Sequence, residues 1–299
     1  MTTSSSYQQN GLTAQTSAVL VAMLVIDSLH LIFGRMLRGM SPYLSGFYVM
    51  FFATVQIALF LAIRRQIKWH ILREHIWFFL AIGGCVGAAT VFSYASVTVI
   101  DAGTASLLSR SSTVITLALS YFWLREKLTG RELLGATLCV IGAVTIGFQP
   151  GNVFRLGSLY VLGAVLFYSL HIAIVKKYGD DIDFGNFFLF RVGMTAVFSL
   201  TLMVGSGNTG LPPTSRDLMV LLLTGTMDVV ISRTLYYWAL RQMRLGIHTI
   251  VLTAAPVLTV VWSILFFGES PTGQGFAGGA IVLFGIVIVA LAQQRQQTS

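Results

Sequence analysis

The chain contains the stretch FWLREKLTGRELLGATLCVIGAV at residues 122–144 and a related stretch, LFFGESPTGQGFAGGAIVLFGIV, at residues 265–287. A shift of 143 residues superimposes the two without a gap and places Glu126 on Glu269. Each stretch passes from an apolar helix end through this glutamate and a Thr-Gly step into a glycine-rich apolar segment. The chain therefore contains two copies of one unit.

The composition indicates that lipid, and not water, surrounds most of the chain. Of its 299 residues, 55% are hydrophobic and only 10% are charged, whereas a soluble domain carries about 25% charged residues. An apolar run of about 18 or more residues can cross a bilayer as a helix. We find ten such runs, at residues 17–37, 42–63, 75–97, 103–123, 131–149, 156–176, 184–205, 217–240, 246–267 and 273–292.

Each copy holds five of the predicted spans. Because five is an odd number, the second copy must enter the membrane from the opposite side. The sequence thus predicts an all-α integral membrane protein with ten transmembrane helices in two inverted five-helix repeats. Many secondary transporters follow this plan and hold their substrate near the midplane. The predicted parts are a polar N-terminal tail (1–16), the first repeat (17–149), the second repeat (156–292) and a C-terminal tail (293–299).

The basic residues of the connecting segments predict the orientation. With a cytoplasmic N-terminus, the outside holds four of them: Arg35, Arg38, Arg155 and Arg216. The inside holds twelve: Arg64, Arg65, Lys68, Arg73, Arg125, Lys127, Arg131, Lys176, Lys177, Arg241, Arg244 and Arg295. The positive-inside rule then places both termini in the cytoplasm of a multi-pass protein of the inner or plasma membrane. The net charge of +8 is topogenic, and we expect no nucleic acid partner.

The two quoted stretches resemble the signature of the EamA branch of the drug/metabolite transporter superfamily, and the resemblance extends over nearly the whole chain as two units. It implies export or exchange of small polar metabolites, with amino acids as typical substrates. Members of that family often have a proline in the middle of the fourth helix. Pro256 occupies this place in the second copy, but Thr113 stands there in the first. A hinge common to both copies is therefore not predicted.

The paired glutamates have two readings. Glu126 and Glu269 are either gate residues near the two membrane faces or structural residues at helix ends, and Pro256 joins them as a gating or structural candidate. Thr129 and Glu132 have the spacing of a capping box at the start of the fifth span. The glycine-rich fifth and tenth spans are predicted to be scaffold helices or the contact of a homodimer, since small residues let helices approach closely in lipid.

Several ionisable side chains lie inside predicted spans, where a charge is costly and usually functional. Asp27 and His30 share a helix face in the first span and are candidates for substrate binding or proton relay. The motif Ser-Leu-His around His30 recurs at His171 after a shift of 141 residues. Asp228 lies near the middle of the eighth span. Arg191, in the seventh span, is predicted to snorkel to the cytoplasmic face.

The fourth span carries a polar stripe of small residues with a single charge, Arg110. The planar guanidinium of an arginine matches a carboxylate. In the first copy the stripe is Gly103, Ser106, Arg110 and Thr113, and in the second it is Gly246, Thr249, Thr253 and Pro256. Such a stripe is either a substrate path or a seam between helices. The candidate substrate-binding residues are Arg110, Asp27, His30, Asp228, Arg233, Tyr237, His171, Ser106, Thr249 and Thr253.

These features predict a secondary transporter of small polar metabolites, such as amino acids, that works by alternating access through a cavity lined by spans one, three, four, six, eight and nine. If Arg191 also reaches the cavity, the excess of arginine favours an organic anion. A transporter of sugar-linked metabolites and a membrane-embedded lipid-modifying enzyme are also compatible with the sequence. No catalytic constellation, P-loop or metal-binding motif is visible in the sequence, so we expect no catalytic residues, cofactor or metal. Asp27 and His30 permit proton coupling.

Overall fold

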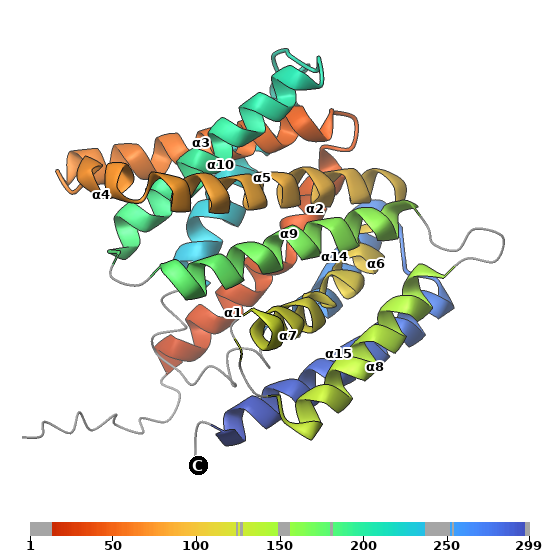
Figure 1. The fold of residues 1–299 in the computed structure, drawn as a ribbon. Helices are drawn as coiled ribbons and strands as arrows, with labels where there is room; N and C mark the ends of the chain where they lie inside the picture. The colour runs from red at the N-terminus through yellow and green to blue at the C-terminus, as the bar shows by residue number, and fades with distance from the viewer. Residues whose placement is uncertain are drawn as a thin grey trace, which may run out of the picture.

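The computed structural model describes residues 14–123, 125, 128–148, 156–179, 182–236, 252 and 254–296, and their regular structure is entirely helical. The helices are α1 (Ala14–Ser28), α2 (His30–Met36), α3 (Pro42–Ile63), α4 (Trp69–Glu74), α5 (Ile76–Val99), α6 (Ala102–Ser109), α7 (Ser112–Phe122), α8 (Gly130–Gly147), α9 (Leu156–Tyr178), α10 (Phe184–Gly205), α11 (Ser215–Thr224), the π-helix η1 (Gly225–Ile231), α14 (Ala255–Phe267) and α15 (Gly273–Gln296). Figure 1 shows their arrangement.

Eight helical segments in the described part of the chain are long and apolar enough to cross a membrane. They are Val19–Met36, Pro42–Ile63, Ile76–Val99, Gly130–Gly147, Leu156–Tyr178, Phe184–Gly205, Ser215–Tyr236 and Gly273–Ala292. Each coincides with a predicted span. The fourth predicted span differs, because it is divided into α6 and α7. Of the ninth, the described helix is the shorter α14.

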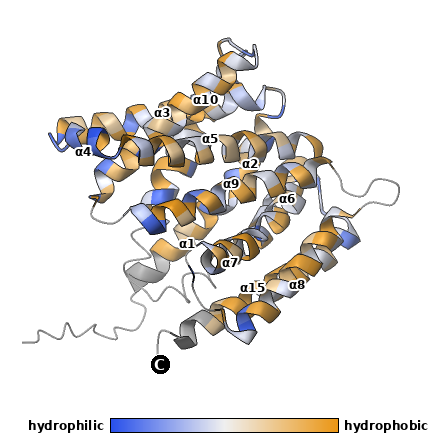
Figure 2. Ribbon diagram, viewed as in Figure 1, coloured by the Kyte–Doolittle hydropathy of each residue, from blue (hydrophilic) through white to orange (hydrophobic). Residues whose placement is uncertain are grey.

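The apolar residues of these helices cover the outside of the molecule as well as its interior. Figure 2 shows hydrophobic residues along most helices and hydrophilic ones over the short helix α4. Large apolar side chains such as Trp77, Phe122 and Leu265 are exposed on the surface. Contiguous apolar surface of this extent is stable only against lipid. The chain is therefore a multi-pass helical membrane protein.

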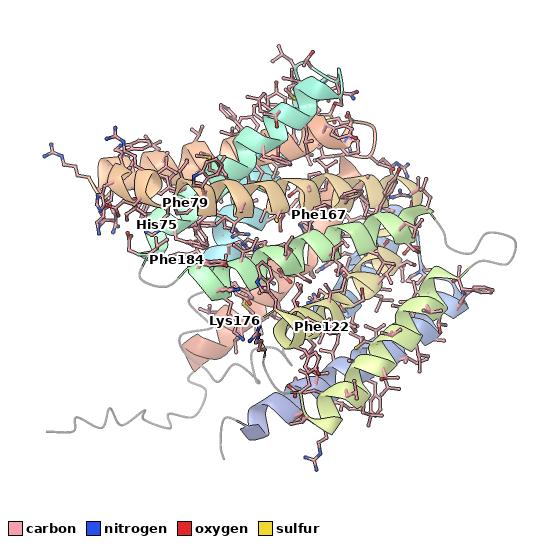
Figure 3. The ribbon with its side chains drawn as sticks, viewed as in Figure 1. His75, Phe79, Phe122, Phe167, Lys176 and Phe184 are labelled. Atoms are coloured by element: carbon pink, nitrogen blue, oxygen red, sulfur yellow. The ribbon has the colours of Figure 1, made fainter. Side chains whose placement is uncertain are left out.

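Two layers of helices enclose the centre of the molecule. In Figure 1, α3, α5 and α10 lie together on one side, α8 and α15 lie side by side at the opposite edge, and α9 crosses between them beside α5. Aromatic contacts join the first group: the ring of Phe79 lies 5.6 Å from that of Phe190. Phe167, labelled in Figure 3, stacks on Phe92 at 5.9 Å and fixes α9 against α5.

Three membrane-crossing segments lose regular α-helical geometry near their middle. The first is interrupted at Leu29, the fourth at Arg110 and Ser111, and the eighth passes into η1. In lipid the backbone groups at such breaks must find partners. The N–H groups of Arg110 and Ser111 donate to carbonyls three residues earlier, at 3.3 and 3.0 Å. The hydroxyl of Thr259 donates to the carbonyl of Ser28 at 2.8 Å.

The glycine-rich faces of α8 and α15 pack against each other within one chain. A Cβ atom added to Gly142 would lie 2.6 Å from the carbonyl oxygen of Gly278. The predicted capping box at Thr129 and Glu132 is confirmed, since both of its hydrogen bonds form at the start of α8. These glycines therefore serve contact inside the molecule. A homodimer through the same two helices stays a prediction.

We expect Gly142→Ala to destabilise the protein by about 1–3 kcal/mol, the usual cost of overpacking. The new methyl group meets backbone atoms of Gly278 and Val282, which cannot rotate away. Gly130→Ala is the matched control, because no atom lies within 4 Å of its added Cβ. Thermal unfolding of both purified variants in detergent measures the difference. Equal midpoints would show that the close approach of α8 and α15 is dispensable.

Candidate functional site

A cavity of about 250 Å³ lies among the central helices. Its lining comes from the predicted spans one, three, four, six, eight and nine. It also comes from span seven, which the sequence indicated only as an alternative through Arg191, and from span two, which the sequence did not indicate. Met50 represents span two, and Arg191 and Thr195 represent span seven. The other polar residues of the lining are Asp27, His30, Thr90, Ser93, Ser106, Ser109, Arg110, Ser112, Tyr168, Asp228, Arg233 and Thr259.

Asp27 lies between two arginines in the lining of this cavity. Its two carboxylate oxygens are 3.8 Å from Nη2 of Arg110 and 3.9 Å from Nη1 of Arg233. These distances allow charge attraction but exceed the 2.7–3.2 Å of an N–H···O hydrogen bond. Neither guanidinium is therefore held by Asp27 in a closed, bidentate pair. Arg110 stands at the interruption between α6 and α7, where the break turns its side chain toward α1.

His30 forms the second polar group of the cavity. Its Nδ1 lies 2.7 Å from Oδ2 of Asp228, and its Nε2 lies 3.2 Å from the hydroxyl of Ser93. The sequence suggested Asp27 as the companion of His30 because they share a helix face. That pairing is wrong in the structure, where the break at Leu29 separates α1 from α2 and η1 presents Asp228 to the imidazole.

The predicted position of Arg191 at the cytoplasmic face is wrong. Its side chain does not snorkel outward, since the residue is only 5% exposed and lines the cavity. The helix α10 begins at Phe184, as predicted, and the Asp183 carboxylate caps it. Arg191 then lies about 10 Å along the helix axis from that end. Its Nε atom is buried and has no hydrogen-bond acceptor among the described residues.

The remaining candidate residues are divided between the cavity and its surroundings. Ser106 lines the cavity and donates to Thr259 at 3.3 Å. His171 is buried but does not line the cavity. Its ring lies 5.4 Å from the ring of Tyr168, which is a lining residue. Pro256 is buried in the first turn of α14. Four candidates lie outside the described residues: Tyr237, Thr249, Thr253 and Glu126.

Glu269 lies apart from the cavity, in the connection between α14 and α15. Arg35 of α2 forms a two-pronged ion pair with it, through Nη2 and through Nε at 2.9 Å, and also donates to the carbonyl of Val97 at the end of α5. Nη1 of Arg38 approaches Glu269 at 3.4 Å. This glutamate thus connects the ends of helices from both halves of the chain.

The charges of the cavity are unequal. Three arginines and two aspartates line it, so the lining is cationic even when His30 is neutral. Nε of Arg110 is, like that of Arg191, buried without an acceptor in the described part of the chain. Buried donors are normally satisfied. The arrangement therefore offers charged N–H groups to an anionic ligand.

The lining residues that were not named as substrate-binding candidates differ in how clearly the sequence marked them. Ser93, Thr195 and Thr259 are hydroxyl residues in apolar helices, like many others that only bond to their own helix. Tyr168 had a weak signal, since the shift of 141 residues places it opposite Asp27. Arg191 had the strongest signal, as a charge inside a span.

Comparison with known proteins gives the family. The profile of the EamA-like transporter family matches residues 16–148 and again residues 155–291. The chain belongs to this family, within the drug/metabolite transporter superfamily, and is a membrane transporter. A solved structure, described as the crystal structure of a protein, has a TM-score of 0.62 and 16% identity, and the match covers 95% of this chain and 99% of the other. It supports the fold alone.

Individual relatives agree with the family. An uncharacterized transporter of Clostridium kluyveri is 27% identical over 228 residues, which cover 70% of this chain and 71% of that protein. An uncharacterized transporter of Archaeoglobus fulgidus is 24% identical, covering 84% and 90%. Human solute carrier family 35 member G1 is 23% identical, covering 74% of this chain and 64% of that protein.

A double-mutant cycle tests the ion pair at Glu269. The Arg35 and Glu269 side chains are 11% and 25% exposed, so we expect Arg35→Ala and Glu269→Ala to show a coupling of about 0.5–3 kcal/mol, as residues in contact do. The control is the pair of Lys68 and Asp183, 54% and 44% exposed and 3.8 Å apart. An exposed pair contributes about 0–1 kcal/mol. Thermal unfolding in detergent measures both cycles, and a coupling no larger than the control would contradict a structural tie at Glu269.

Proposed function

We propose that this protein is a secondary transporter of small organic anions, which it carries through the central cavity by alternating access. The observation that supports this is the cationic excess of the lining, with Arg110 and Arg191 each holding a buried donor that lacks an acceptor among the described residues. A substrate carboxylate would bind at the arginine site, by which we mean Arg110, Arg191 and Arg233 around Asp27.

The size of the cavity bears on whether the substrate is a small metabolite or a sugar-linked one. Ligand pockets usually measure about 300–1,000 Å³, and this one has about 250 Å³. A small metabolite fits such a space better than a sugar-linked molecule. We also favour transport over a lipid-modifying enzyme, since the relatives carry the names of transporters.

A zwitterionic amino acid is the second candidate substrate. Oδ1 of Asp228 is buried and has no hydrogen-bond partner in the described part of the chain, so it is a free acceptor for an ammonium group. Asp228 already binds His30 through Oδ2, however, and Asp27 faces two arginines. Both carboxylates thus have cationic or hydrogen-bonding neighbours before a substrate arrives. We therefore place organic anions first.

The architecture that we propose for this mechanism is ten spans in two inverted repeats, 17–149 and 156–292. Two observations support it. The family profile matches the chain twice, with limits within one residue of these. The helices α7 and α14 begin at Ser112 and Ala255, which are 143 residues apart, although only the second copy has a proline there. In this mechanism the ion pair of Arg35 and Glu269 would join the helix ends of the two halves.

The orientation is open to a direct test. We propose an inner or plasma membrane location with both termini in the cytoplasm. A cysteine at Gln66, between α3 and α4, should then react with an impermeant maleimide only after the cells are opened. A cysteine at Thr209, between α10 and α11, should react in intact cells. Both positions are exposed, and Cys85 and Cys139 are first replaced by alanine. The reverse pattern of labelling would invert the topology.

The substrate class is tested by uptake of radiolabelled lactate, succinate, alanine and glucose into proteoliposomes. Lactate and alanine form a matched pair, since one carries a hydroxyl where the other carries an ammonium group. We expect transport of the acids and none of glucose. Preference for alanine over lactate, abolished by Asp228→Asn, would favour the amino acid reading.

Ligand binding to variants of the purified protein tests the role of Arg110. Arg110→Gln should weaken lactate binding by about 1.5–3 kcal/mol, the size of a hydrogen bond to a charged group, and Arg110→Lys should weaken it less. The loss should be much smaller for lactamide, which lacks the charge. Arg216→Gln is the control, because Arg216 is exposed in the first turn of α11. Competition binding gives each affinity, and equal losses for lactate and lactamide would make Arg110 a structural partner of Asp27.

A further inference from the structure

The cavity contains a second polar group that the arginine site does not use. His30, of the first half of the chain, contacts Asp228, of the second half, and Ser93 of α5. The imidazole is 33% exposed, whereas the carboxylate is 5% exposed. Both residues line the cavity, and the histidine is the more accessible member of the pair.

The hydrogen bonds leave one nitrogen available for a proton. An ionised carboxylate only accepts hydrogen bonds, so Nδ1 of His30 must carry the hydrogen that it shares with Asp228. Nε2 then accepts from the Ser93 hydroxyl in the neutral imidazole. When a proton from cavity water binds Nε2, the hydroxyl rotates and becomes the acceptor, because it can act in either role. Both protonation states are thus fully hydrogen-bonded with little movement.

The charges around His30 determine what its proton does to an anion. The titratable and charged groups near it are Asp27 on α1, Asp228 and Arg233 on the eighth span, and Tyr94 on α5. Arg110 and Arg191 line the same cavity. Protonation of the imidazole adds a positive charge to a lining that is already cationic, which strengthens the attraction for an anion.

We propose that the His30–Asp228 pair is a proton-binding site and that the protein is a proton–anion symporter. The proposal rests on the proposed transport of anions. Because coupling between two sites is reciprocal, a bound anion favours the protonated imidazole as much as the proton favours the anion. The loaded carrier then moves both together. An inward proton gradient drives uptake by this mechanism, the opposite of the export that the family resemblance implies.

An amino acid, the second candidate substrate, would give the opposite direction of coupling to the proton. An ammonium group at Asp228 competes with a proton on His30 for the same carboxylate, so an amino acid and a proton would exchange across the membrane. The direction of the proton flux therefore distinguishes the two.

The experiment uses the full chain in proteoliposomes with the membrane potential clamped at zero by potassium and valinomycin. Radiolabelled lactate, succinate and glutamate are supplied outside, with and without an inward proton gradient. We expect the gradient to cause accumulation of the transported acid above its external concentration. Lactate affinity should also be higher at acid than at alkaline pH, by about 5–150-fold, the usual range of coupling.

The variant His30→Gln should lose accumulation and the pH dependence of affinity, while exchange of labelled for unlabelled lactate continues at a reduced rate. His70→Gln is the matched control, because His70 is exposed in α4, and it should behave as the unaltered chain. If His30→Gln does not fold, proton uptake on addition of lactate to the unaltered protein in detergent, followed with a pH indicator, is the second measurement.

Each outcome decides a separate point. If uptake does not depend on the proton gradient, or if accumulation persists in His30→Gln, the proposed proton-binding site is wrong and the proposal of anion transport still stands. Proton release on lactate binding would also overturn it. Failure of every acid to enter at any pH would reject anion transport and the symport together.

Discussion

Asp27 is a carboxylate inside a membrane, and the structure of the central helices follows from the need to stabilise its charge. A charge at the centre of a span must meet protein or water. Here it meets Arg110 from the first half of the chain and Arg233 from the second, at distances that leave the guanidinium groups open to another anion. This attraction thus holds the binding groups of the cavity in place, and a substrate carboxylate would compete with Asp27 for them.

The interruptions of the helices allow Asp27, Arg110 and Arg233 to meet in one cavity. A continuous helix presents its side chains in a fixed order around its axis, and its backbone groups are all engaged. The breaks at Leu29 and Arg110 and the π-helix at Asp228 change that order where the charges lie. Hydroxyl groups such as that of Thr259 satisfy the carbonyls near the breaks. By contrast, α8 and α15 are regular, and their glycines bring the two backbones into contact away from the cavity.

The sequence predicted the eight long spans because hydrophobic length is a property of each segment alone. It also predicted that Asp27, His30, Arg110, Asp228 and Arg233 would share one cavity, since lipid excludes each of them. It could not predict the partners. Helical spacing placed His30 with Asp27, and only the break between α1 and α2 turns the histidine to Asp228. Arg191 was misjudged because distance from a helix end does not tell whether a long side chain turns outward or inward.

The π-helix at residues 225–231 has a consequence for how the site varies between related chains. A π-helix accommodates an extra residue within an α-helix, and one residue corresponds to a rotation of about 100°. Because the wide turn absorbs that residue, its loss would restore a regular helix without turning the segment that carries Arg233 relative to the one that carries Thr224. Only side chains inside the π-helix, of which the Asp228 carboxylate is one, would move relative to the cavity. In this span a change of length would act on the pairing of His30 with Asp228, although no cavity residue has been substituted.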